Sequence, residues 1–265
     1  NAHNNLFEEV AKFRAARRIW AEMMRDLGAK DPKAMMLRFH TQTGGSTLTA
    51  QQPLNNIARV TLQTLAAVLG GTQSLHTNGY DEALGLPTEE AARIALRTQQ
   101  VVAFESGVTD AADPLAGSWM VESMTEDMVQ QVKAIMAQVE DLGGAVSAIE
   151  QGWMQDRIAR SAYITQKKIE AGEKVIVGVN RFLNDRVEDI PVLHVDDSIR
   201  KVQSEKLTGI KARRDNQRSQ QCLREIDRLA VEGGNLMPAV IHAVEAMCTL
   251  GEISDVLRAR FGEYR

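Results

Sequence analysis

The sequence predicts an α/β fold in which short parallel strands alternate with long helices. Helical spacing of apolar side chains recurs in three early stretches, residues 6–27, 49–69 and 87–106. Short strands are predicted between these helices, at 35–41 and 72–76. Each strand ends in uncharged polar residues, within RFHTQTGGSTLTAQQ (38–52) and GGTQSLHTN (70–78). Strands that alternate with helices form parallel sheets, which carry their functional groups at the carboxyl ends of the strands.

The first two helices have start or stop signals as well as apolar spacing. Val10 and Phe13 belong to the apolar face of the first helix, and Gly28 ends it. The second helix is expected to start at Thr49, because Thr49 and Gln52 have the spacing of a capping box, in which the two side chains bond free backbone amides. It is expected to stop at the Gly-Gly pair that precedes the next strand.

Pro87 and Thr88 open the third helix, and the character of the chain changes soon after it ends. A turn-rich boundary at 113–118 leads into a mostly helical region. Its predicted elements are helices at 125–142, 152–171, 199–232 and 236–261, a strand at 175–179 and an extended linker at 185–197. The predicted organisation is therefore βα units over residues 1–111 and a mostly helical extension over 112–265.

Composition and charge argue against several classes of protein. The chain has 265 residues and a formal net charge of −4, and its pI of about 5.8 argues against a nucleic-acid-binding surface. The basic run at 211–214 is interpreted as a solvated helix face. Cys222 and Cys248 form no disulfide or zinc pattern, which favours reduced thiols in the cytoplasm. The chain has no apolar run of about eighteen residues, so no membrane span is predicted. A start at Asn1 suggests a fragment.

The polar residues at the strand ends are candidates for a binding or catalytic site. His40 and Gln42 are two apart in a strand, so they share a face and Thr41 points away from it. Gly44 and Gly45 let a bulky ligand approach the backbone. The second strand and its exit contribute more polar residues: Gln73, His76, Asn78, Asp81 and Glu82. Most of these side chains are neutral, which suits orientation of an acyl, amide or ribose group better than charge-driven hydrolysis.

Structural and functional interpretations of these residues compete. Taken alone, His40 is better explained as a structural residue at a strand end, and Glu82 as the cap of a turn. Together with Gln42, Gln73 and His76, the two interpretations of His40 are evenly balanced. The sequence has no GxSxG, which argues against a hydrolase. It also has no GxGxxG and no GxxxxGKS/T, so it carries no dinucleotide or P-loop signature.

Four longer motifs carry a resemblance to a known family. They are FEEVAKFRAARRIWAE (7–22), LRFHTQTGGSTLTAQQPLNNIARVT (37–61), GGTQSLHTNGYDEALGLPTEEAARIALRTQ (70–99) and VIVGVN (175–180). Together they resemble the large, acyl-CoA-binding subunit of the methylmalonyl-CoA mutase family. The resemblance implies a (β/α)8 TIM barrel, in which residues 1–3 close the sixth strand, 35–41 form the seventh and 72–76 the eighth. Residues 1–111 would then be the last βα units of the barrel, followed by the helical extension.

The resemblance also implies a reaction and a set of site residues. The family catalyses radical isomerisation of acyl-CoA with adenosylcobalamin, and the leading assignment is (R)-methylmalonyl-CoA to succinyl-CoA. His40, Gln42 and Gln73 resemble catalytic residues that line the cavity near the acyl group. Five positions resemble cofactor contacts: Gly45, Asn78, Glu82, Gly85 and Leu86. In such chemistry the protein's task is to hold the reactants and to shield them from water.

Departures from the family pattern leave alternatives open. The chain has no DxHxxG, the motif whose histidine ligates cobalt, so that histidine is expected on another chain or domain and no metal ligand is assigned here. The expected partner is a cobalamin-binding small subunit in a hetero-oligomer, and the chain alone is expected to be inactive. Many members carry Trp at the position of Ser46. Isobutyryl-CoA, 2-hydroxyisobutyryl-CoA and ethylmalonyl-CoA are alternative substrates, and a noncatalytic structural subunit is an alternative role.

Overall fold

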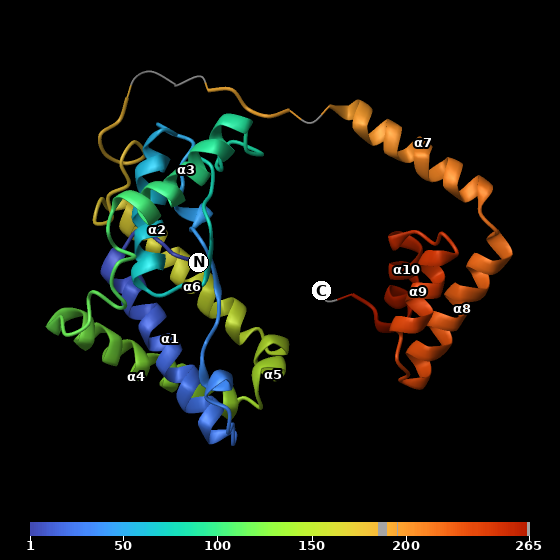
Figure 1. The fold of residues 1–265 in the computed structure, drawn as a ribbon, viewed down its shortest axis with the longest axis horizontal. Helices are drawn as coiled ribbons and strands as arrows, with labels where there is room; N and C mark the ends of the chain where they lie inside the picture. Colours follow the sequence, from blue (N-terminus) through green and yellow to red (C-terminus); the bar gives the residue numbers. More distant parts are fainter. Residues whose placement is uncertain (185–189, 195, 264–265) are drawn as a thin grey trace. The chain divides into compact units, whose positions relative to one another are not determined.

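The computed structural model describes residues 1–184, 190–194 and 196–263 (Figure 1). The chain divides into two compact units, Asn1–Leu193 and His194–Arg265, and each is described by itself. Of the linker predicted at 185–197, residues 185–189 and 195 lie outside the described residues, and Asp197 already belongs to a helix. Among the described residues, none of the helices combines the length and the apolar character that a membrane crossing requires.

The first unit contains the sheet, and the second is helical. The elements of the first unit are α1 (Leu6–Asp26), the 3-10 helix η1 (Pro32–Met35), β1 (His40–Gln42), the 3-10 helix η2 (Gly45–Thr47), α2 (Asn55–Leu69), β2 (Ser74–His76), α3 (Glu89–Glu105), α4 (Trp119–Asp141), α5 (Ala145–Glu150) and α6 (Trp153–Glu170). The elements of the second unit are α7 (Asp197–Arg213), α8 (Asn216–Glu232), α9 (Met237–Glu245) and α10 (Leu250–Phe261). The predicted α/β class is confirmed, with helices as the larger part.

The sheet is small and parallel. β1 pairs with β2 in the register His40↔Ser74, Thr41↔Leu75 and Gln42↔His76. Along the other edge of β1, Ala2 forms a parallel bridge with Thr43, and the Ala2 amide donates to the Gln42 carbonyl at 2.9 Å. Three successive segments therefore run parallel, with α1 and α2 in the connections between them, as successive βα units require.

Phe13 of α1 is the central side chain of the core between the sheet, α1 and α2. It packs with Ala2 and Ala67, and its ring stacks on Phe39 with ring centroids 5.2 Å apart. Gly70 lies against the same ring, because a Cβ built there would be 2.4 Å from Phe13 Cδ2. These contacts fix the sheet and α2 against one face of α1.

A second face of α1 packs against α4, and the two helices lie side by side in Figure 1. Ala15 and Ile19 meet Val129 in an apolar cluster. Beside it, Arg14 donates to Asp113 at 2.6 and 2.7 Å and to Glu122 at 2.7 Å. α1 is therefore covered by apolar contacts on two faces. The helix predicted at 6–27 from apolar spacing is confirmed.

The strand predicted at 35–41 is shorter in the structure and begins at His40. The short helix η1 takes in Met35, the first residue of the predicted strand, and residues 36–39 form neither helix nor strand. Pro32 fits the first turn of this helix, and the Asp31 side chain accepts the Lys33 amide at its start. The proline and the acidic cap therefore account for the helical turn at Met35.

The capping box predicted for Thr49 and Gln52 does not form, and α2 begins at Asn55 instead. Gln52 precedes Pro53 and has a φ of 48°, a conformation that a right-handed helix excludes. The Gln52 side chain donates to the Phe182 carbonyl at 2.9 Å. The turn before α2 is thereby tied to a much later segment of the chain.

The region after α3 differs from the prediction in three places. α4 begins earlier, at Trp119, and the short helix α5 is an additional element. The strand predicted at 175–179 is a turn, held by the Asn180 side chain, which accepts a backbone amide at 2.7 Å. The Val177 carbonyl in this turn accepts from Arg59 of α2 at 2.8 Å. A second contact therefore ties α2 to this segment.

Two long helices predicted in the second unit are each broken once. The helix predicted at 199–232 breaks at Arg214, which is extended, and Asp215 caps the start of α8. The helix predicted at 236–261 breaks near Met247, whose φ is 61°. α8, α9 and α10 pack around an apolar core of Leu223, Ile226, Ala239, Ala243, Cys248 and Ile253.

The interpretation of the basic run at 211–214 as a solvated face is confirmed for residues 211–213, which are exposed, but it is wrong for Arg214. Its side chain is only 5% exposed and donates to both carboxylate oxygens of Glu252, at 2.7 and 2.6 Å. Glu252 also accepts the Thr249 amide at 2.8 Å, within a capping box at the start of α10. Hydrogen bonding from Arg214 holds the pKa of the Glu252 carboxyl well below its ordinary value.

We expect Glu252→Gln to lower the free energy of unfolding of the second unit by roughly 2 kcal/mol at pH 7, because it leaves the Arg214 guanidinium without its carboxylate. The carboxyl pKa is lower in the folded than in the unfolded chain. Its stabilisation is therefore present above the unfolded pKa of about 4.3 and is lost as the pH falls through the folded pKa. The free energy of unfolding of Glu252→Gln should therefore fall less between neutral and acid pH than that of the wild type. Urea denaturation at neutral and acid pH, followed by amide exchange in α8 and α10, measures both effects.

Glu225→Gln is the matched control for this experiment. Glu225 pairs with Arg228 in the same unit, but the two side chains are 47% and 51% exposed. Exposed pairs contribute little, so the control should leave the stability unchanged. An equal loss in the two variants would contradict the importance of the contact with Arg214.

Candidate functional site

His40 and Gln42 lie on the exposed face of β1, whereas Thr41 between them is fully buried. The alternation predicted for this strand is confirmed. Ser74 and His76 of β2 lie beside them, because register partners in a parallel pair share a face. His40 Nδ1 and Ser74 Oγ share a hydrogen bond of 2.7 Å, which leaves the other ring nitrogen, Nε2, for a ligand.

Asn78 follows β2 and is held by Thr43, which follows β1. The Thr43 hydroxyl donates to Asn78 Oδ1 at 2.7 Å and accepts the Asn78 amide at 2.9 Å. The Gln42 side-chain nitrogen lies 3.5 Å from the same Oδ1. Asn78 is only 2% exposed, and its Nδ2 has no hydrogen-bond partner among the described residues. A buried donor without a partner costs free energy, and a ligand that accepts from it would remove that cost.

Gly45 begins η2 and lies beside Asn78 and Glu82. A Cβ built at this position would be 2.9 Å from Asn78 Nδ2 and 3.1 Å from Glu82 Oε1. A side chain at Gly45 would collide with these two polar groups, so its absence lets them lie this close to the Gly45 backbone. We call the narrow space between Gly45 and the two groups the gap at Gly45. We call the five residues His40, Gln42, Gly45, Asn78 and Glu82 the strand-end cluster. The structure brings these predicted site residues together at the carboxyl ends of β1 and β2.

Gly85 and Leu86 belong to the loop after β2 but contact a later segment of the chain. Leu86 forms an antiparallel bridge with Leu193, and a Cβ at Gly85 would lie 3.1 Å from Val192 Cγ1. The loop folds back at Asp81, whose carbonyl accepts the Gly85 amide at 3.2 Å. These contacts hold Gly85 and Leu86 to the later segment rather than to the strand-end cluster.

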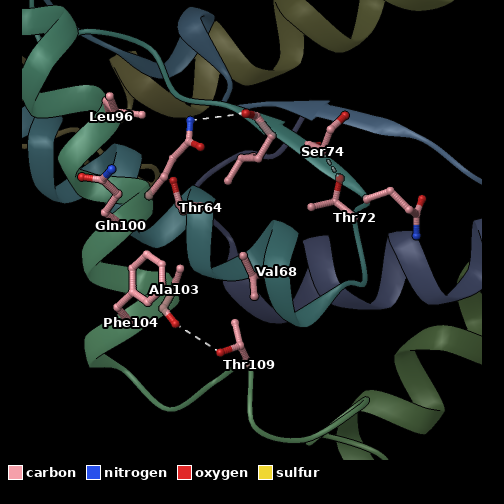
Figure 2. Close-up of a pocket in the computed structure, with 12 residues that line it drawn as sticks. Thr64, Val68, Thr72, Ser74, Leu96, Gln100, Ala103, Phe104 and Thr109 are labelled. Carbon is pink, nitrogen blue, oxygen red and sulfur yellow. Dashed lines mark hydrogen bonds between the residues drawn. The ribbon is translucent and has the colours of Figure 1, made fainter.

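Gln73 precedes β2 and is not brought to the strand-end cluster. Its side-chain oxygen accepts the Phe39 amide at 2.7 Å, and its side-chain nitrogen donates to the Gly71 carbonyl at 2.8 Å. Gln73 instead lines a cavity of about 370 Å³ beside β2. Figure 2 shows this cavity between α2, which carries Thr64, and α3, which carries Gln100.

Sequence reasoning missed four residues that shape the site. Thr43 and Ser74 hold two members of the strand-end cluster, as described above. Strand alternation is a signal for Thr43, because it places this residue on the buried side with Thr41. Asn56 and Gln63 of α2 are also fully buried. Their polarity gave no such signal, since polar residues of an amphipathic helix usually face solvent.

The chemistry of the strand-end cluster is that of a holding site. It offers an imidazole, two side-chain amides and a single carboxylate, that of Glu82. Within residues 1–184, 190–194 and 196–263, no three His, Cys, Asp or Glu side chains come together in a way that could hold a metal ion. The imidazole, amide and carboxylate groups of the strand-end cluster are suited to orient carbonyl and hydroxyl groups of a ligand.

The fold and the strand-end cluster define an α/β protein with a largely neutral, hydrogen-bonding site at the carboxyl ends of parallel strands. Residues 1–263 match a family model described as methylmalonyl-CoA mutase. The chain belongs to the methylmalonyl-CoA mutase family, which confirms the resemblance carried by its motifs.

Similar proteins include mutases with different named substrates. The methylmalonyl-CoA mutase of Escherichia coli K12 is 44% identical over 98% of this chain and 37% of its own length. The mitochondrial methylmalonyl-CoA mutase of Mus musculus is 44% identical over 98% of this chain and 35% of its own length. The 2-hydroxyisobutanoyl-CoA mutase large subunit of Aquincola tertiaricarbonis is 45% identical over 100% of this chain and 48% of its own length. The chain thus spans between about a third and about half of the length of these relatives.

Proposed function

We propose that this chain contributes the last βα units of a (β/α)8 barrel to an adenosylcobalamin-dependent acyl-CoA mutase, an isomerase. In this assignment Ala2 belongs to the sixth strand, β1 is the seventh strand and β2 the eighth, and residues 112–265 form the helical extension. The parallel order of the three segments supports it. The observation that carries the proposal is the gap at Gly45, bounded by Asn78 and Glu82.

The strand-end cluster fits adenosylcobalamin. The edge of a corrin ring needs a backbone that can be approached closely, and Gly45 presents no side chain. The unused Asn78 donor and the Glu82 carboxylate match ribose hydroxyls, which both accept and donate hydrogen bonds. Gly85 and Leu86 are proposed as further cofactor contacts, a role in which their loop would have to leave the later segment that it contacts here. The cobalt-ligating histidine is proposed to come from a small subunit or another domain. When bound, the cofactor supplies the radical chemistry.

The chain's own residues would bind and orient the acyl-CoA. His40, fixed at Nδ1 by Ser74, would offer Nε2 to the acyl group. Gln42 would offer its side-chain nitrogen, because its 3.5 Å contact with Asn78 is long and a ligand can replace it. Gln73 is proposed as the third cavity residue, a role in which its side chain would have to leave its present backbone partners. These neutral groups would hold the substrate while the closed barrel excludes water.

The leading substrate is (R)-methylmalonyl-CoA, converted to succinyl-CoA, because that name recurs among the relatives. The relative named 2-hydroxyisobutanoyl-CoA mutase large subunit supports a second candidate substrate and a small-subunit partner. Isobutyryl-CoA, ethylmalonyl-CoA and a noncatalytic structural role are further alternatives. A noncatalytic chain would have no reason to retain the whole strand-end cluster. A cytoplasmic location is proposed from the two free cysteines, Cys222 and Cys248.

The test is to express the complete reading frame that contains this chain together with a cobalamin-binding partner. We expect interconversion of methylmalonyl-CoA and succinyl-CoA that requires added adenosylcobalamin. Turnover of 2-hydroxyisobutyryl-CoA in its place would keep the mutase and change the substrate. Association of the two chains with no turnover of any of the four candidate acyl-CoA substrates would favour the structural role. Failure to bind adenosylcobalamin would overturn the proposal.

A further inference from the structure

α2 carries two side-chain amides, those of Asn56 and Gln63, that are fully buried. The two residues are seven apart in sequence, about two helical turns, so they lie on the same face of α2. A buried amide costs free energy unless its donors and its acceptor are bonded, and an apolar side chain would fill the same space without that cost. The partners of the two amides indicate why polar residues stand here.

Gln63 connects the backbone around Gly45 to the start of the chain. Its Oε1 accepts the Gly44 amide at 2.8 Å. Its Nε2 donates to Thr47 Oγ1 at 2.6 Å and to Asn4 Oδ1 at 2.6 Å. The Thr47 hydroxyl in turn donates to the Gly44 carbonyl at 2.7 Å. Gly45 therefore lies between two residues that Gln63 holds.

Asn56 connects the loop after β1 to the loop after β2. Its Nδ2 donates to the Thr49 and Tyr80 carbonyls, both at 2.9 Å. Its Oδ1 accepts the Thr49 amide at 3.1 Å and the Arg59 guanidinium at 2.6 Å. Tyr80 lies in sequence between Asn78 and Glu82, the two residues that border the gap at Gly45. The donors and the acceptor of Asn56 are therefore all in use.

We propose that Gln63 and Asn56 are positioning residues that set the width of the gap at Gly45. Gln63 fixes the backbone on the η2 side of the gap, and Asn56 fixes the backbone on the β2 side. Both side chains come from one helix, so α2 sets the distance between the two loops together with the hydrogen bonds that join Thr43 directly to Asn78. The inference rests on the proposed function, because it assigns this geometry to the binding of adenosylcobalamin.

Gln63→Met tests the inference, since methionine keeps the length of the side chain but removes its hydrogen bonds to Gly44, Thr47 and Asn4. The Gly44 amide then keeps only the Ala2 carbonyl, at 2.7 Å, as its acceptor. The complete protein with its cobalamin-binding partner is titrated with adenosylcobalamin. We expect the affinity to fall about tenfold, the effect of a lost hydrogen bond. The KM for acyl-CoA should change by less than about twofold, because the strand residues keep their register. Amide exchange at 44–48 should become faster, whereas exchange in the middle of α2 stays slow.

Two further variants make the result interpretable. Thr64→Val is the matched control, because Thr64 is the next residue of α2, is fully buried, and has a hydroxyl without a hydrogen-bond partner among the described residues. It should change neither the cofactor affinity nor the exchange at 44–48. Thr47→Val removes one acceptor of Gln63 within the loop itself. It should lower the cofactor affinity and speed the exchange at 44–48 to a smaller extent than Gln63→Met. It takes the place of Gln63→Met in the experiment if that variant does not fold.

The outcomes separate the inference from the proposed function. Unchanged affinity and unchanged exchange at 44–48 in Gln63→Met and Thr47→Val would overturn the inference. So would a general rise in exchange across the first unit with equal losses in KM and affinity, because Gln63 would then be only a structural residue. If the wild-type protein binds no adenosylcobalamin, the proposed function fails. In that case, faster exchange confined to 44–48 still supports the positioning role, and unchanged exchange overturns it.

Discussion

Replacing Gly45 with valine is expected to weaken the binding of adenosylcobalamin roughly 100-fold while leaving the fold intact. The new side chain would enter the gap between Asn78 Nδ2 and Glu82 Oε1, which lie 2.9 and 3.1 Å from the position of its Cβ. Asn78 is not free to move, because Thr43 holds it through two hydrogen bonds. Glu82 is exposed and can swing away. Valine therefore displaces the Glu82 side chain and also forces a local shift of the backbone at Gly45 away from Asn78, and the close approach proposed for the cofactor is lost.

The measurement is a titration of the complete protein and its cobalamin-binding partner, followed by the absorbance of the corrin. A thermal melt of the same samples shows whether the fold is retained. Gly209→Val is the control, because a Cβ at Gly209 of α7 would have no atom within 4 Å. It should bind the cofactor like the wild type. Binding by Gly45→Val within about threefold of the wild type would mean that the gap is not part of the cofactor site.

Phe13→Ala is expected to lower the free energy of unfolding of the first unit by about 3–5 kcal/mol, the range for a large aromatic side chain removed from a core. Phe13 is 7% exposed and contacts residues from three parallel segments and α2. Its stacking partner Phe39 lies directly before β1, so the loss also loosens the start of that strand. Gly70 lies against the ring and has no side chain that could fill the space.

Urea denaturation of the complete protein, with amide exchange read in α1 and β1, measures this loss. Leu27→Ala is the matched control, because Leu27 stands at the end of the same helix and is 77% exposed. Its effect should stay below about 0.5 kcal/mol. Similar losses in the two variants would show that Phe13 is not the centre of the core.

The helices of the first unit could be predicted because their signals are local. α1 ends before Gly28, as its spacing indicates. α3 begins after Thr88, whose side chain accepts the Ala91 amide at 3.2 Å. At Thr49 the same kind of signal fails, because Pro53 sets the conformation of the residue before it. Spacing alone does not tell which of two competing local signals determines the structure.

Strand alternation was sufficient to predict the part of the candidate site that lies on β1. It places His40 and Gln42 on one face without knowledge of the fold. The surroundings of Gln73 could not be predicted in this way, because β2 begins at Ser74, two residues later than predicted, and the Gln73 side chain bonds to backbone groups instead. Gln63 and Asn56 could not be found either, since only contacts with loops distant in sequence bury them.

Two contacts with the turn at 177–182 limit which chimeras of related mutase genes can fold. Gln52 and Arg59 donate to the carbonyls of Phe182 and Val177. Every residue type has a backbone carbonyl. A chimera that takes this turn from another member of the family therefore keeps both hydrogen bonds if the backbone follows the same path. Gly178 is the exception, because its φ is +82° and a Cβ there would lie 2.9 Å from Gln52 Cδ. A tolerated crossover therefore has to conserve Gly178, the Asn180 side chain that holds the turn and the backbone path.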